Sequence, residues 1–292
     1  MTRIIENLSE ISASYDAVFC DLWGCLHNGQ RPFAEAVRAL ETFRNGGGFV
    51  LLLTNSPRPK HSVETQLDGI GVARDLYHEV ATSGDSARAA LASGHYGTNV
   101  FHIGPERDLP FFAPDPEIPG LENINRVPLD QAEAIVCTGL YDDQTETPDD
   151  YAAIFLEAKN NGLDLLCANP DIVVDHGDKR IYCAGALAAE YTARGGTSHY
   201  FGKPHPPIYD LARRRLSDAA GREIENRRIL CIGDGIHTDI LGAINEDMDS
   251  LFISGGLAAE ETATAPQPDP EKLDAFLTAH SLSPTATIGH LR

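Results

Sequence analysis

Four short polar clusters, each directly after an apolar run, contain the residues of this sequence best suited to do chemistry. They hold Asp21, Thr54 with Asn55, Lys203, and Asp234 with Asp239. Each cluster alone has a plain structural explanation, because such residues often end strands or form turns. Four of them at successive strand ends favour a single shared site. The carboxyl ends of buried parallel strands are where open α/β sheets bind ligands.

Asp21 and Asp234 are the predicted metal ligands. A carboxylate that attacks a phosphate is repelled by its negative charge, and a Mg²⁺ ion held by carboxylates relieves this repulsion. We therefore expect Asp21 and Asp234 to hold Mg²⁺. Asp239 lies at the start of a predicted helix, five residues after Asp234, and is placed to brace the site from a second layer.

Lys203, Thr54 and Asn55 are the predicted phosphate-binding residues. The ammonium group of Lys203 would supply positive charge to the phosphate oxygens. Thr54 and Asn55 would donate hydrogen bonds to the remaining oxygens. These groups together would act on a small phosphorylated substrate.

Apolar runs alternate with helical patterns over most of the sequence. Strands are predicted at residues 17–20, 49–53, 198–202, 228–232 and 250–253, with a helix at 33–44. This alternation predicts an α/β fold with a parallel sheet and helices on both faces. The triple glycine 46–48 follows a helix and precedes a strand, so we expect a helix stop there and not a phosphate-binding loop.

The chain is predicted to contain two domains, one inserted into the other. The outer domain comprises residues 1–81 and 184–292, and the inserted domain comprises residues 82–183. The inserted segment has its own predicted strands at 99–103, 134–138 and 165–168, and a helix for which Thr147 is the N-cap and Pro148 the first residue. Residues 175–178 are rich in metal-binding types, but the flanking apolar runs favour a polar hairpin turn.

The four clusters, in this order, resemble the four motifs of the haloacid dehalogenase (HAD) superfamily of hydrolases. The chain is most similar to the class IIA branch, which holds 4-nitrophenylphosphatases and sugar or nucleotide phosphatases. There a cap domain is inserted between the second and third motifs, where residues 82–183 lie here, and Asn169-Pro170-Asp171 is a further match. The resemblance implies a Rossmann-like core with an α/β cap of the C2 type, which closes over the site and selects the substrate. It also implies Mg²⁺-dependent phosphate hydrolysis.

The resemblance assigns roles to individual residues. Asp21 would be the nucleophile that forms an aspartyl-phosphate, with Lys203 and Thr54 completing the catalytic set. Mg²⁺ would be held by Asp21, Asp234 and the backbone carbonyl of Trp23. Phosphatases of this superfamily carry an aspartate at the position of Trp23, where it protonates the leaving oxygen. An indole cannot do this, and loss of a general acid costs about 10²–10⁴-fold in rate.

Three functions are compatible with Trp23. The first is a phosphatase that uses a surrogate acid or a substrate with a good leaving group. His27 is the candidate acid, although a loop histidine is expected to be solvated, and Cys25 is expected to be packed. The second is carbon–halogen or phosphonate hydrolysis on the same scaffold. The retained Asp234 and Asp239 argue against a dehalogenase, which dispenses with Mg²⁺, and phosphonate hydrolases use a lysine from a different kind of cap. The third is a catalytically weak protein that binds phosphorylated metabolites.

Composition restricts the partners and the location. The net charge of −20 argues against nucleic acid and anionic membranes as partners. The six cysteines form no C-x-x-C pair and five of them end or lie within apolar runs, which favours buried thiols in a reducing compartment. With an N-terminus that lacks a long apolar stretch, this predicts a cytoplasmic protein without a signal peptide. The sequence leaves the oligomeric state open, a homodimer included.

Overall fold

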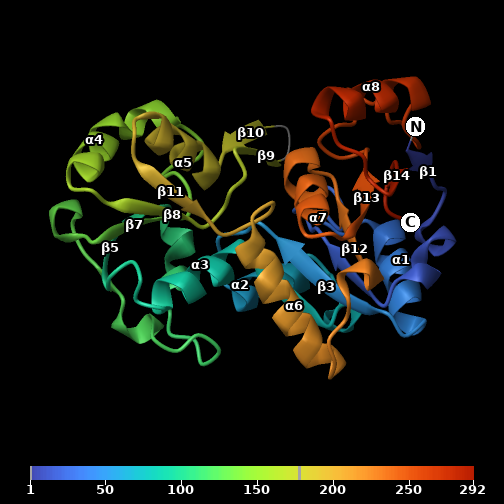
Figure 1. Ribbon diagram of the computed structural model, residues 1–292, viewed down its shortest axis with the longest axis horizontal. Helices are drawn as coiled ribbons and strands as arrows, with labels where there is room; N and C mark the ends of the chain where they lie inside the picture. The colour runs from blue at the N-terminus through green and yellow to red at the C-terminus, as the bar shows by residue number, and fades with distance from the viewer. Residues whose placement is uncertain (1, 177–178) are drawn as a thin grey trace. The chain divides into compact units, whose positions relative to one another are not determined.

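The computed structural model describes residues 2–176 and 179–292 (Figure 1). These residues form two compact units. Unit 1 comprises Met1–Thr54, Glu64–Ala81 and Tyr209–Arg292, and unit 2 comprises Asn55–Val63 and Thr82–Ile208. Each unit contains its own sheet, so each is described by itself.

Unit 1 is built on a seven-stranded sheet. The strands, in their order across the sheet, are β1 (Arg3–Ile4), β14 (Ala286–Ile288), β13 (Asp249–Ile253), β12 (Ile229–Gly233), β2 (Ala17–Cys20), β3 (Phe49–Thr54) and β4 (Glu79–Thr82). The pairs from β1 through β3 are parallel. The α-helices with residues in this unit are α1 (Ala34–Asn45), α2 (Lys60–Gly69), α6 (Pro206–Ala220), α7 (Leu241–Asn245) and α8 (Pro270–His280).

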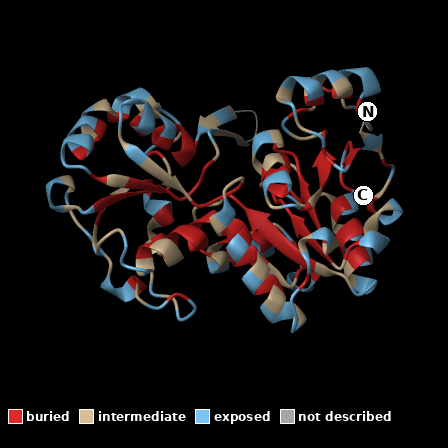
Figure 2. Cartoon of the chain, in the orientation of Figure 1, coloured by how far each residue is buried: buried red, intermediate tan, exposed pale blue. Residues whose placement is uncertain are grey.

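The order of the strands reverses beside β2. The chain proceeds from β2 to β3 and β4 on one side, whereas β12, β13 and β14 follow on the other. Ligands bind at such a reversal point, outside the carboxyl ends of the strands. Every residue of β2 and β12 is buried (Figure 2), as expected for apolar runs covered on both faces.

Helix α1 ends where the triple glycine begins, as predicted. Gly46 is the C-cap residue and Gly47 has φ +91°, a left-handed conformation that favours glycine. The backbone N–H groups of Gly46, Gly47 and Gly48 all donate to carbonyls of α1 residues. They are therefore not available as a phosphate-binding loop.

Unit 2 contains a second parallel sheet of five strands. Across the sheet these are β11 (Thr197–Tyr200), β8 (Asp164–Cys167), β7 (Ala134–Cys137), β5 (Asn99–Ile103) and β6 (Asn125–Arg126). Helices α3 (Ser83–Ala92), α4 (Ala152–Asn160) and α5 (Ala184–Ala193) belong to the same unit. Two hydrophobic clusters contain alternate residues of the central strands, such as Ile135 and Cys137 in one and Ala134 and Val136 in the other.

The strand predicted at 198–202 is the main correction to the expected topology. We expected it in the sheet of the outer domain, but β11 pairs with β8 in the sheet of unit 2. Helix α5 also lies in unit 2, which continues to Ile208, so the predicted division at residue 183 falls inside this unit. Apolar periodicity locates a strand in the sequence but does not say which sheet it joins.

Two local predictions in unit 2 are met closely. Thr147 is the N-cap of a 3₁₀ turn at Pro148–Tyr151, with a capping box to Asp150, and α4 follows directly. Strands β9 (Val173–His176) and β10 (Lys179–Tyr182) form the expected antiparallel hairpin. The predicted turn itself includes residues 177 and 178, which lie outside the described residues.

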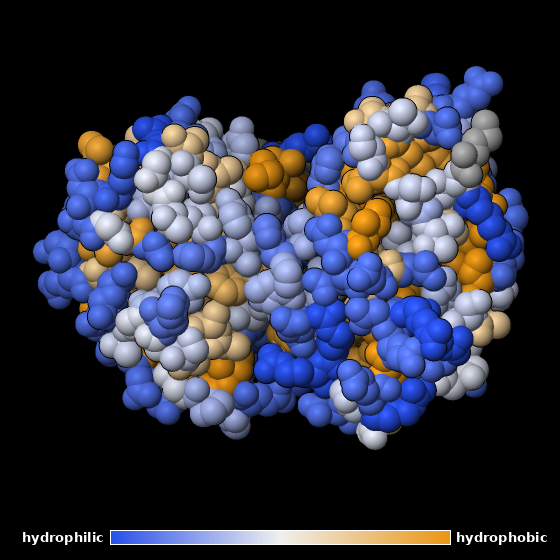
Figure 3. Space-filling model, in the orientation of Figure 1, coloured by the Kyte–Doolittle hydropathy of each residue, from blue (hydrophilic) through white to orange (hydrophobic). Residues whose placement is uncertain are grey.

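The described part of the chain contains no helix that is both long and apolar enough to cross a bilayer. Hydrophilic side chains cover most of the face shown in Figure 3, and they gather over α6. This distribution agrees with an ordinary content of charged residues, 23% of the chain.

Candidate functional site

The loop after β2 carries Asp21 and is held by its own backbone. Asp21 immediately follows the strand, its N–H donates to the Ile232 carbonyl at 2.8 Å, and its side chain is only 8% exposed. The Leu22 carbonyl accepts from the N–H groups of Leu26 and His27. The His27 carbonyl accepts in turn from the Gly24 N–H at 3.0 Å. None of these backbone hydrogen bonds involves the side chain at position 23.

Asp234 immediately follows β12, the strand that pairs with β2. It is 7% exposed, and its Oδ2 accepts a hydrogen bond from the Leu257 N–H at 3.0 Å. Two glycines leave the space that its carboxylate occupies. A Cβ atom on Gly24 or Gly256 would lie 2.3 or 2.0 Å from Asp234 Oδ2. The sequence showed these glycines, but only the folded chain reveals that they make room for Asp234.

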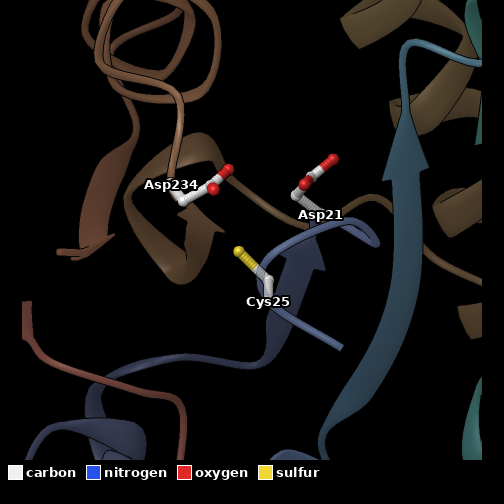
Figure 4. A group of neighbouring side chains, drawn as sticks. All are labelled: Asp21, Cys25 and Asp234. Carbon is white, nitrogen blue, oxygen red and sulfur yellow. The ribbon is translucent and has the colours of Figure 1, made fainter. Parts of the chain in front are cut away.

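Asp21, Cys25 and Asp234 are brought together at the reversal point of the sheet. One ligand atom from each lies within 4.8 Å of the others, and Figure 4 shows the Asp234 and Cys25 side chains directed into the space beside Asp21. Two buried carboxylates at this separation repel each other unless a cation lies between them. Carboxylate oxygens are the ligands that Mg²⁺ prefers, so the residues present fit this ion.

The Cys25 thiol is a neutral neighbour of the two carboxylates. Burial, together with the charges of Asp234 and Asp21, raises the pKa of Cys25 well above its usual value. Sulfur is also a poor ligand for a hard cation such as Mg²⁺, so Cys25 is not a proposed ligand. The prediction that Cys25 is packed is confirmed.

Asp239 closes the loop that begins at Asp234. Its Oδ2 accepts from the Gly235 N–H at 3.1 Å, and a Cβ atom on Gly233 would lie 2.1 Å from Asp239 Cγ. The segment Ile236–Ile240 forms one turn of π-helix, which leads into α7. Asp239 thus shapes the loop that carries Asp234.

Trp23 packs against Gly29 and His27 within the loop after β2. A Cβ atom on Gly29, whose φ is +83°, would lie 2.3 Å from Trp23 Cη2. The rings of Trp23 and His27 meet edge to face, with centroids 5.4 Å apart. The Asn28-Gly29 dipeptide is a turn signal in the sequence, but its match to the indole was not foreseen.

His27 is buried, contrary to the expectation of a solvated loop histidine. It is 1% exposed, and its Nδ1 accepts from the Gly29 N–H at 2.9 Å. Burial lowers the pKa of His27 to about 4. The ring is therefore neutral at pH 7, which argues against it as the surrogate acid.

The predicted phosphate-binding residues are divided between the two units. Thr54 is the buried last residue of β3 in unit 1, whereas Asn55 and Lys203 lie in unit 2. Asn55 Oδ1 accepts from the Lys203 N–H at 2.7 Å, and Asn55 Nδ2 donates to the Lys203 carbonyl at 3.1 Å. Asn55 Nδ2 also donates to Asp171 Oδ1 at 2.8 Å.

This network gives Asn55 a clear structural role that the sequence did not reveal. It ties the segment after β3 to Lys203, which is 2% exposed, and to the Asn169–Asp171 loop. Gly202 permits the contact, because a Cβ atom there would lie 2.4 Å from Asn55 Oδ1. A pairing between residues 116 and 148 positions apart cannot be read from local patterns.

Comparison with known proteins agrees with this geometry. Residues 18–113 match a family model described as haloacid dehalogenase-like hydrolase, and residues 200–279 match one described as HAD-hydrolase-like. A crystal structure of a haloacid dehalogenase-like hydrolase from Brucella suis 1330 is 41% identical, with a TM-score of 0.85 over 99% of this chain and 100% of that one.

Two curated relatives are more distant. A 5′-nucleotidase of Bacillus subtilis is 26% identical over 86% of this chain and 91% of its own. A D-glycerol 3-phosphate phosphatase of Mycobacterium tuberculosis is 28% identical over 89% of this chain and 69% of its own. A crystal structure of glycerol phosphate phosphatase from M. tuberculosis in complex with magnesium has a TM-score of 0.68 and 24% identity, over 96% of this chain and 76% of that one.

Proposed function

The chain belongs to the haloacid dehalogenase-like hydrolase family, and we propose that it is a Mg²⁺-dependent phosphatase of small phosphorylated metabolites that works through Asp21. The observation that carries the proposal is the pair of buried carboxylates, Asp21 and Asp234, at the reversal point of the sheet. The curated relatives named as a 5′-nucleotidase and a glycerol phosphate phosphatase support a phosphate monoester as the substrate class.

Each residue of the site has a proposed role. Mg²⁺, when bound by Asp21, Asp234 and the Trp23 carbonyl, would reduce the repulsion between a carboxylate and a phosphate. Asp21 attacks phosphorus and forms an aspartyl-phosphate, while the bond to the leaving oxygen breaks. Thr54, Asn55 and Lys203 bind the phosphate oxygens, and Asp239 keeps the Asp234 loop in place.

The leaving group must depart without a strong acid from the loop after β2. The indole of Trp23 is not an acid, and His27 is neutral because burial lowers its pKa to about 4. Burial also raises the pKa of the Cys25 thiol well above its usual value, which makes it a weak acid. An aryl or acyl leaving group is stable as an anion and needs little protonation, whereas an alkoxide is not. We therefore propose that substrates with good leaving groups are preferred.

The inserted segment, the location and the oligomeric state are the remaining parts of the proposal. Residues 82–183 would act as the body of a cap that selects the substrate, with the Asn169–Asp171 loop contributing through its contact to Asn55. The six cysteines are all buried free thiols, which supports the predicted cytoplasmic location. A homodimer stays a prediction.

Trp23 favours one second candidate function, a protein that binds phosphorylated metabolites and turns them over weakly or not at all. Its metal site would be retained for binding alone. Carbon–halogen or phosphonate hydrolysis is less well supported, because the curated relatives are phosphatases.

A single assay series separates these functions. Release of phosphate would be measured from 4-nitrophenyl phosphate and from glycerol phosphate, with and without Mg²⁺. We expect Mg²⁺-dependent turnover of the aryl ester, loss of turnover in Asp21→Asn and Asp234→Asn, and normal turnover in the exposed control Asp68→Asn. Turnover that survives in Asp21→Asn would exclude Asp21 as the nucleophile. Phosphate binding without any turnover would favour the binding protein.

A further inference from the structure

Two histidines outside the carboxylate site form a close pair in unit 1. His237 lies in the π-helical turn after Asp234, and His280 is the last residue of α8. His237 Nε2 and His280 Nδ1 are 2.9 Å apart, at the protein surface. The two rings have centroids 4.7 Å apart and planes inclined by 71°. One of these nitrogens donates a hydrogen bond to the other.

The His280 ring is held in position by an aromatic stack. Its centroid lies 4.5 Å from that of Phe276, and Phe276 stacks on Phe252 at 5.9 Å. Phe252 is buried in β13, so the stack is anchored in the sheet. A ring fixed in this way loses little conformational freedom when it binds a ligand.

The separation of the two nitrogens fits neighbouring positions on a metal ion. Metal–nitrogen distances of about 2.0–2.1 Å place two nitrogens about 2.8–3.0 Å apart when the angle at the metal is a right angle, and about 3.3 Å apart when it is tetrahedral. The observed 2.9 Å is the length of the hydrogen bond between the rings, and it brings both nitrogens within reach of a single metal ion. Imidazole nitrogens suit Ni²⁺, Cu²⁺ and Zn²⁺ alike.

We propose that His237 and His280 form a second metal site, which takes a transition metal such as Ni²⁺, Cu²⁺ or Zn²⁺. Among the described residues, only Asp21, Cys25 and Asp234 bring three potential ligands together, so water would complete the coordination of the histidine site. Binding requires that neither of the two facing nitrogens carries a proton. The shared proton moves to an outer ring nitrogen, and both imidazoles stay neutral.

The two sites differ in chemistry and share one segment of chain. Carboxylates suit Mg²⁺, whereas imidazoles suit later transition metals. The net charge of −20 raises the concentration of any cation near the surface. A metal held by His237 and His280 would link α8 to the segment that carries Asp234 and Asp239.

Isothermal titration of the whole protein with Ni²⁺, in excess Mg²⁺, tests the proposal. Ni²⁺ is the better probe because it does not oxidise thiols as Cu²⁺ does. We expect one Ni²⁺ to bind per chain. Loss of even an outer-layer partner costs 10–100-fold in metal affinity, so His237→Asn and His280→Asn should each weaken Ni²⁺ binding by at least about tenfold.

Two matched variants keep the test specific. His95→Asn removes an exposed histidine of unit 2, and Asp234→Asn removes a carboxylate ligand of the first site. Both should bind Ni²⁺ as the parent protein does. The proposal fails if His237→Asn or His280→Asn binds Ni²⁺ normally, or if Asp234→Asn abolishes the binding. None of these outcomes depends on the phosphatase proposal.

Discussion

The buried neutral His27 should make the protein less stable as the solution becomes acidic. Its pKa falls from the usual 6.5 to about 4 in the folded chain because the ring is buried beside Trp23. In the unfolded chain the ring binds a proton near pH 6.5. Between these two values the unfolded state holds more protons than the folded state, so the stabilising contribution is complete above pH 6.5 and is lost as the pH falls toward 4.

The magnitude follows from the size of the shift. One pKa unit corresponds to about 1.4 kcal/mol, so this shift corresponds to about 3 kcal/mol in total, and about 2 kcal/mol of it is lost by pH 5. Small domains are stable by only about 5–15 kcal/mol, so a change of this size is measurable. His102 in unit 2 has its pKa lowered to about 4 in the same way, by burial and by Arg126.

Urea denaturation at pH 7.5 and pH 5 measures this contribution, with His27→Asn as the comparison. The side-chain carbonyl oxygen of the substituting asparagine can still accept from the Gly29 N–H, but that side chain does not titrate. The term from His102 is common to both proteins and cancels. We expect the variant to lose about 2 kcal/mol less than the parent between the two pH values. Equal losses in both proteins would refute a buried neutral His27.

Three further substitutions test the site and the units. Trp23→Asp should raise kcat/KM on an alkyl phosphate by about 10²–10⁴-fold, because it restores a general acid and leaves the backbone hydrogen bonds of the loop in place. An unchanged value would show that the missing acid does not limit the rate. In Gly29→Ala, the new side chain has to adopt a positive φ and to lie against Trp23. This variant should therefore lower the free energy of unfolding, measured in urea, by about 1–2 kcal/mol or more. Arg88 is 0% exposed and pairs with the buried Asp85, so Arg88→Met should lower the free energy of unfolding by about 3–5 kcal/mol. Arg38→Met, at an exposed arginine, should leave the free energy of unfolding almost unchanged. Similar losses in both variants would contradict this account of Arg88.

Local sequence patterns were sufficient for most elements and placed the two proposed metal ligands at strand ends. The buried run at 17–20 forms β2 at the predicted bounds, and the run at 99–103 forms β5 at the predicted bounds. Asp21 and Asp234 were selected because each follows such a run. A strand of apolar residues must be covered on both faces, and its carboxyl end must emerge at one edge of the sheet.

Tertiary packing determined the sheet that each strand joins and the contacts between residues, which local sequence patterns do not contain. The run at 198–202 joined the sheet of unit 2, because strand pairing depends on which neighbour is available and not on periodicity. The network of Asn55 with Asp171 and Lys203 joins residues 116 and 148 positions apart. The burial of His27 and the fit of Trp23 on Gly29 depend on the folded conformation of one loop, which the residue types do not specify. Thus the sequence by itself determined the residue types of the metal site and the strands that present them. The tertiary structure decided their separation, their burial and the charge state of their neighbours, because these depend on the chain segments that exclude water from the site.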